Sequence, residues 1–258
     1  MAKSQLPTPL HGWRAFAGEV GVVVLGVAIA LGAGQLAEAI NWRMQVSDAR
    51  GALGTELADS VGQGVERQHI YDCTERRLDQ IGQLLDEASR SGQLPPIGDI
   101  GMPQPRVWLD STWQTTMAGQ TASHFPRREL NLFGIVYAFV ADVREQAQRE
   151  LVTWAGIYTI VGPGRPIGAG EIAALRREVS QARLLNRTMT FESTRVGQYA
   201  DAAGVTYDAE TVRGYADAPA NEFTVCKPLG TVPPEHYGAA PLNGALEAVG
   251  NSAVVLPE

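Results

Sequence analysis

The residues best suited to bind an anion cluster around Pro126, in the stretch His124-Phe-Pro-Arg-Arg-Glu129. Two adjacent arginines at the start of a helix could offer forked hydrogen-bond donors to a phosphate or carboxylate, close to the positive end of the helix dipole. The alternative is an ordinary solvated first turn whose charges pair within the helix, and we favour it. His124, Arg127 and Arg128 are therefore the candidate ligand-binding residues, although no ligand is specified.

Other patterns that could carry chemistry are less specific. His69, Asp72, Glu75 and Asp79 recur at helical spacings of three or four residues and could hold a metal ion, but such a row is typical of the solvated face of a helix. The stretch 162–168 is rich in glycine, yet its two prolines remove the N–H groups that a phosphate would need, so we interpret it as a loop between helices. Since the chain lacks the signatures of metalloproteases, serine hydrolases and thiol oxidoreductases, we predict no enzyme activity, no metal and no cofactor.

The composition excludes several further classes of protein. Hydrophobic residues make up 45% of the 258 and charged residues 19%, so the chain can bury a core. A net charge of -7 argues against nucleic acid as a partner, because phosphate binding needs a basic surface. The only lysines are Lys3 and Lys227, and neither lies in a motif suited to a P-loop protein or a Schiff-base enzyme.

A long apolar segment near the N-terminus predicts a membrane anchor. From Val20 to Gly34 no residue has a polar side chain, and extension to residues 17–37 adds only Glu19 and Gln35. As a helix, those residues span about 31 Å, which matches the hydrocarbon layer of a bilayer. We therefore predict a transmembrane helix over residues 17–39, flanked by the interfacial aromatic residues Trp13, Phe16 and Trp42.

Two alternatives to an anchor remain open: a cleavable signal peptide, for which 37–39 resembles a cleavage site, and a buried helix of a soluble protein. In the anchored form, Lys3 and Arg14 precede the span with no acidic residue until Glu19, whereas acidic residues outnumber basic ones just after it. The positive-inside rule then places residues 1–16 in the cytoplasm and the chain from residue 40 onward outside.

Small residues recur every four positions on one face of the span, at Gly26, Ala30 and Gly34. Such a stripe lets a second transmembrane helix approach closely, either from another copy of this chain or from another envelope protein. Glycine and alanine are also simply common in membrane helices, which is the alternative interpretation.

The remainder predicts an all-α fold: a long-helix antiparallel bundle followed by an irregular tail. Residues 40–90 form a long helix, which we expect to be kinked or broken near 62–64 because glycine weakens helices. A Pro/Gly linker over 91–106 leads into a helical region over 107–204, with a short helix at 109–117 and a hairpin of helices at 126–161 and 169–203. The tail, 205–258, is mostly irregular apart from a short helix at 209–215.

Two apolar stripes define the hairpin. The first, interrupted only by Arg144, consists of Leu130, Phe133, Tyr137, Val140, Ala147, Leu151, Trp154, Tyr158 and Val161. The second, interrupted by Asn186, consists of Ile172, Leu175, Val179, Ala182, Met189, Ser193, Val196 and Ala200. A buried Asn186 could fix the register of the helices or bind a polar group, but we expect it to face water at the edge of the bundle.

The two cysteines, Cys73 and Cys226, are the only pair available for a disulfide. In an oxidising compartment a bond between them would attach the tail to the first exported helix. If the domain is not exported, both are ordinary small buried residues.

Several stretches resemble a family of uncharacterised bacterial single-pass membrane proteins, in which a Gly-Glu pair opens the transmembrane helix and a long helix leads into an exported α-helical domain. They are Trp13-Arg-x-Phe-x-Gly-Glu-Val20, Leu25-Gly-Val-x-Ile-Ala-Leu31 with Trp42, Thr112-Trp113, His124 to Leu130, Tyr137, and Ala182-Arg-Leu-Leu-Asn186-Arg. The resemblance covers roughly residues 11–200 and implies the topology and the fold, but no site residues.

We therefore expect an inner-membrane protein with a periplasmic helical domain that acts as a structural or protein-interaction module of the envelope. The alternative is a periplasmic ligand-binding or sensing module that works through a partner subunit, since helical bundles can form a pocket between their helices.

Overall fold

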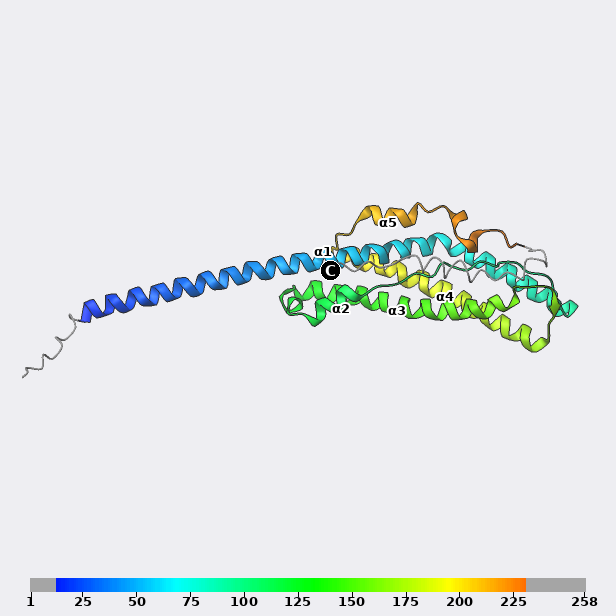
Figure 1. Ribbon diagram of the computed structural model, residues 1–258, viewed down its shortest axis with the longest axis horizontal. Helices are drawn as coiled ribbons and strands as arrows, with labels where there is room; N and C mark the ends of the chain where they lie inside the picture. The colour runs from blue at the N-terminus through cyan, green and yellow to red at the C-terminus, as the bar shows by residue number, and fades with distance from the viewer. Residues whose placement is uncertain (1–12, 231–258) are drawn as a thin grey trace, which may run out of the picture.

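The computed structural model describes residues 13–230, with side chains from residue 16, and its fold is all-α (Figure 1). One helix, α1 (Trp13–Ser91), is 79 residues long and extends far beyond the rest of the molecule at its N-terminal end. At 1.5 Å per residue its length is about 118 Å. The C-terminal half of α1 is the first helix of the bundle.

The expected break of the long helix near 62–64 is wrong, because α1 is helical throughout. The glycines in this region are positions of close packing. A Cβ atom on Gly54 would lie 2.3 Å from the carbonyl oxygen of Thr206, and one on Gly64 would lie 2.9 Å from that of Ser193. Their helix-weakening cost is offset because they let other segments pack directly against the α1 backbone.

The predicted helical hairpin is present. Its first arm is α3 (Arg127–Ile157), extended by the 3-10 turn η2 (Tyr158–Ile160), and its second arm is α4 (Ala169–Ala202). Helix α4 packs along both α1 and α3. The bundle therefore has three long helices.

The linker after α1 contributes to the core. It begins with the strand β1 (Gln93–Leu94), which pairs antiparallel with β2 (Arg165–Pro166) in the hairpin loop. Its apolar side chains Leu94, Ile97 and Ile100 are buried, and so is Trp108 just after it. The proline-rich backbone prevents a helix here, but its apolar residues pack between α1 and the hairpin. The short helix α2 (Ser111–Ala118) and the 3-10 turn η1 (Gln120–His124) follow.

The described part of the tail packs along α1. It contains α5 (Ala209–Ala216), η3 (Ala220–Glu222) and η4 (Thr224–Cys226). Cys73 of α1 and Cys226 form a disulfide with a Cα–Cα distance of 4.8 Å, the pairing expected from the sequence. Residues 231–258 of the predicted irregular tail lie outside the described residues, as do most of the N-terminal residues 1–16.

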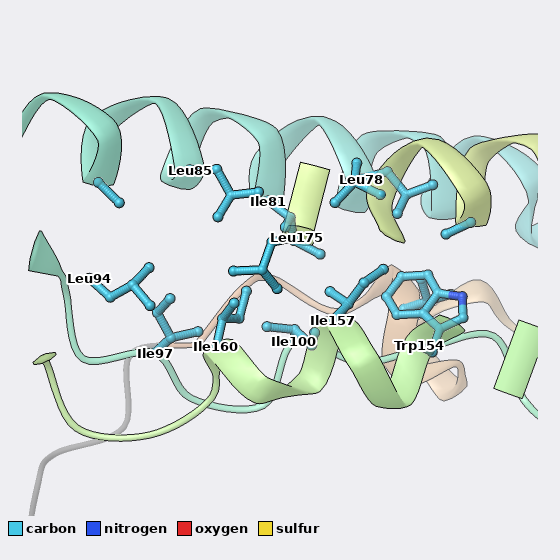
Figure 2. Close-up of a cluster of buried hydrophobic side chains, with 14 of the residues drawn as sticks. Leu78, Ile81, Leu85, Leu94, Ile97, Ile100, Trp154, Ile157, Ile160 and Leu175 are labelled. Carbon is cyan, nitrogen blue, oxygen red and sulfur yellow. The ribbon is translucent and has the colours of Figure 1, made fainter. Parts of the chain in front are cut away.

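Two apolar clusters form the core. The one farther from the N-terminus gathers side chains of α1, the linker, α3 and α4, including Leu78, Ile81 and Leu175 (Figure 2). The other lies nearer the N-terminal extension and includes Leu53, Leu57 and Val140. All predicted stripe positions of α4 are buried, Asn186 among them.

The stripe on α3 differs from its prediction by one position in the second half of the helix. Leu151 is 44% exposed, whereas its neighbour Glu150 is only 6% exposed. The prediction placed the apolar residue inside, but Glu150 has a basic partner there, Arg67 of α1. A paired charge can therefore replace an apolar side chain in the core.

The N-terminal part of α1 is an apolar helix without cover. An 18-residue stretch of it has a mean hydropathy of 2.2, and none of that stretch is buried against the rest of the molecule. Among the described residues, α1 is the one helix long and apolar enough to cross a membrane. The bundle begins directly after this segment, since Val46 is already buried.

Candidate functional site

A layer of polar side chains separates the two apolar clusters. At its centre Arg67 of α1 donates hydrogen bonds to Glu150 of α3, from Nη1 to Oε2 over 2.8 Å and from Nη2 to Oε1. The two side chains are only 7% and 8% exposed. Because each charge is desolvated, each depends on the other to remain in the interior.

Asn186 of α4 completes this layer. Its side chain is fully buried, so the expectation that it faces water is wrong. It accepts a hydrogen bond from Arg67 Nη2 over 3.3 Å, and its Nδ2 donates to Glu75 Oε1 over 2.9 Å. The amide thus connects the central ion pair to a second carboxylate at the bundle surface, where Glu75 also pairs with Arg183.

A second ion pair attaches the linker to α1 beside this layer. Arg106 donates from Nε to Glu66 Oε1 over 2.9 Å and from Nη2 to the other carboxylate oxygen. These hydrogen bonds raise the pKa of Arg106 despite the opposing effect of burial. One turn earlier on α1, Gln63 Nε2 donates to the carbonyl oxygen of Val107 over 3.2 Å.

A cavity of about 50 Å³ lies between α1, the linker and α3 at this level. Both ion pairs line it, together with apolar side chains such as Met102 and Trp108. Two polar atoms of buried residues at the cavity, Gln63 Oε1 and Arg67 Nε, have no hydrogen-bond partner within the described part of the chain. Buried polar atoms normally have partners, so this cavity is the candidate functional site.

The charges of the cavity indicate what it could hold. Two glutamates and two arginines compensate one another, while one acceptor, Gln63 Oε1, and one donor, Arg67 Nε, remain available. The volume suits a few water molecules or one small molecule. An uncharged group with both a donor and an acceptor therefore fits the cavity better than an ion.

A separate polar contact lies within the cluster nearer the apolar segment. Glu56 of α1 accepts a hydrogen bond from the Tyr137 hydroxyl over 2.8 Å, and its other oxygen accepts from Ser111 Oγ and Thr112 N at the start of α2. Burial, and then the nearby Glu56 charge, raise the pKa of Tyr137. The tyrosine remains a neutral donor, and the contact positions α2 on α1.

Of the candidate anion-binding residues, His124 lines a pocket beside α1, whereas Arg127 and Arg128 do not. The His124 ring stacks on Trp42 of α1, with centroids 3.9 Å apart, whereas Arg127 and Arg128 are exposed at the start of α3. The neighbouring Glu129 binds Arg50 of α1 rather than either of them.

Two residues of the row His69, Asp72, Glu75 and Asp79 on α1 form ion pairs with α4. Arg183 donates to Glu75 over 3.1 Å and to Asp79 over 2.6 Å. No cluster of three or more potential metal ligands occurs within residues 13–230. On the apolar segment, a Cβ atom on Gly26 or Gly34, which form the predicted stripe with Ala30, would meet no other segment of the described chain within 4 Å.

The sequence interpretation missed the cavity residues Gln63, Glu66, Arg67, Arg106 and Glu150. Each is a polar residue in a segment that periodicity alone describes as a helix face or a linker. One signal was present in the sequence. Glu150 lies four residues before Trp154 of the predicted apolar stripe, so the two residues share one helix face. The partners of these charges lie 40 and 83 residues away, and no local pattern predicts such pairs.

Comparison with known proteins gives no further assignment: no protein-family model, curated protein or solved structure matches this chain.

Proposed function

We propose that this chain is a single-pass protein of the bacterial inner membrane, whose periplasmic bundle acts as a structural or protein-interaction module of the envelope. The observation that carries the proposal is the continuity of α1. The same unbroken helix supplies the uncovered apolar segment and the first core helix of the bundle. A bundle built this way is held at a fixed distance from the bilayer along the axis of α1.

The disulfide supports a periplasmic bundle. Disulfides persist in oxidising compartments and are rare in the bacterial cytoplasm, and Cys73–Cys226 joins two segments of the exported domain. The basic residues Lys3 and Arg14 before the span favour the same orientation.

The test is a topology reporter fused after residue 258, combined with alkaline extraction of membranes. An alkaline phosphatase fusion should be active and should remain in the membrane pellet. A variant lacking residues 17–39 should lose both properties, which is the matched control. Full-length protein in the soluble fraction, or an inactive phosphatase fusion on a stable chain, would contradict the proposal.

The partner is tested by crosslinking in intact cells. We propose that the Gly26, Ala30 and Gly34 face packs against a second transmembrane helix, so the pair of substitutions G26L and G34L should abolish a crosslinked species heavier than the monomer. Gly32 lies about 200° around the helix from Ala30, and G32L should retain the species. Recovery of monomer alone from the wild-type chain would count against an interaction module.

A second candidate function is ligand binding, favoured by the unpartnered Gln63 Oε1 and Arg67 Nε at the cavity. Thermal unfolding of the full chain with acetamide or formamide as probes tests it. A ligand of the cavity should raise the midpoint by several degrees in the wild type and not in the Q63L variant. If neither probe raised the midpoint, ligand binding at the cavity would be refuted and only the structural role would remain.

A further inference from the structure

One end of the bundle is fixed to α1 immediately beyond the apolar segment. We call residues 119–128, together with Trp42 and Arg43, the membrane-facing tip. The His124 ring stacks on Trp42 with an interplanar angle of 13°. Next to this stack, Arg50 donates two hydrogen bonds to Glu129, at 2.5 and 2.7 Å. Figure 1 shows the start of α3 beside α1 at this end of the bundle.

The distance of the tip from the hydrocarbon layer follows from the geometry of α1. This step depends on the proposed membrane anchoring. If the span ends at residue 39, Trp42 and Arg43 lie about 5 and 6 Å beyond it along the helix axis. The polar headgroup layer on each side of a bilayer is about 5–8 Å thick. Because His124 is in contact with Trp42, the tip lies at the level of the headgroups.

The tip carries basic side chains that the protein leaves available. Arg43, Arg127 and Arg128 are all exposed, and none has an ion pair or side-chain hydrogen bond within the described residues. The acidic groups nearby are Glu129, which binds Arg50, and Glu38, which accepts a hydrogen bond from Trp42. Asp48 is also exposed, but it lies more than one helical turn farther along α1 from the span than Arg43 does. Basic groups therefore dominate the surface closest to the headgroups, although the whole chain is acidic.

We propose that the membrane-facing tip binds anionic phospholipid headgroups through Arg43, Arg127 and Arg128. Guanidinium groups form paired hydrogen bonds with phosphate oxygens, and the negative surface potential of an anionic leaflet attracts basic side chains next to it. Trp42 lies at the interface, where tryptophan is enriched, and the His124 ring stacks on it. Lipid binding here orients the bundle on the membrane surface.

The experiment uses the full chain in nanodiscs of phosphatidylcholine, alone or mixed with phosphatidylglycerol. Amide hydrogen exchange of residues 119–128 is the readout. The anionic lipid should slow exchange there by about fivefold or more, and raised salt should remove the effect because the charges are exposed. In a variant with R43Q, R127Q and R128Q, exchange should be equally fast in both lipids.

A matched control removes three exposed arginines far from the tip, with R149Q, R177Q and R187Q, and should keep the response to phosphatidylglycerol. Equal exchange of the wild type in both lipids would overturn the proposal, and so would equal loss of the response in the control variant. Protection by inorganic phosphate in phosphatidylcholine nanodiscs would also overturn it, since it would identify a general anion site. Each of these results leaves the membrane anchor itself intact, whereas failure to assemble into nanodiscs would refute the anchor.

Discussion

The Arg67 guanidinium forms a two-point ion pair with the Glu150 carboxylate in the interior of the bundle, although 83 residues separate them in the sequence. The pair lies between the two apolar clusters and joins α1 to α3. At this level the linker fills much of the space between these two helices. Its contribution to stability depends on both partners being present.

We therefore expect E150A to lower the free energy of unfolding by about 3–5 kcal/mol, because it leaves the Arg67 charge buried without a partner. Replacement of both residues, with R67M and E150L, should restore stability to within about 1–2 kcal/mol of the wild type, since apolar side chains of similar size can replace a buried ion pair. Chemical unfolding of the full chain in detergent measures both variants.

The control for this pair is E145A, which removes an exposed ion pair with Arg149 on the same helix. Exposed pairs contribute at most about 1 kcal/mol. If E150A were no more destabilising than E145A, the buried pair would have no structural role.

The ion pair between Asp110 and Arg144 makes the stability of the bundle depend on pH in the acid range. Arg144 Nη1 donates a hydrogen bond to Asp110 Oδ1 over 2.6 Å, and this bond is the main cause that lowers the pKa of Asp110. Because the folded pKa lies below the unfolded one, the ionised carboxylate stabilises the fold above the unfolded value of about 4. That contribution is lost as the pH falls through the folded pKa.

D110N should therefore lower the midpoint of thermal unfolding at neutral pH, and its difference from the wild type should disappear in acid. Because the Arg144 side chain is about half-exposed, we expect an effect of about 1 kcal/mol or less. R144Q should show the same dependence on pH, since it removes the other partner of the bond. A difference between D110N and the wild type that is constant from neutral to acid pH would contradict this assignment.

Periodicity predicted those parts of the fold in which one helix face is uniformly buried. On α4 every stripe position is buried. The apolar N-terminal segment was equally clear because its composition alone sets it apart. These features depend on neighbours within a few turns of the same helix.

The candidate site could not be predicted in the same way, because its residues are buried by partners distant in the sequence. Periodicity favoured Leu151 over Glu150 as the core residue, and only the position of Arg67 reverses that choice. Asn186 is buried for the same reason. The linker has too many prolines for any regular pattern, although Ile100 and Trp108 lie in the core.

The glycines of α1 differ in what surrounds them, which gives a matched pair of substitutions. A Cβ atom on Gly54 would lie 2.3 Å from the backbone oxygen of Thr206, whereas one on Gly51 would contact nothing within 4 Å. We expect G54A to destabilise the bundle by about 1–3 kcal/mol, because backbone rather than a flexible side chain must move. G51A should stabilise it by up to about 1 kcal/mol through helix propensity.

Chemical unfolding of both glycine variants compares them directly. A fluorescence or exchange probe of α5 should show that G54A also loosens the segment after Thr206. Equal effects of G54A and G51A would mean that helix propensity, rather than close packing, determines the role of these glycines.

The disulfide between Cys73 and Cys226 closes a loop across 153 positions of the sequence and attaches the segment after α5 to α1. Loss of this link enlarges the unfolded ensemble, so a C73S and C226S double variant should be less stable by up to about 5 kcal/mol. Added reductant should lower the unfolding midpoint of the wild type and leave that of the variant unchanged.

The same cysteines report the compartment in intact cells. After denaturation, a maleimide of high mass should shift the wild-type band on a gel only if reductant is added first. A complete shift without reductant would show two free thiols, and it would remove the main support for a periplasmic bundle while leaving the helical fold in place.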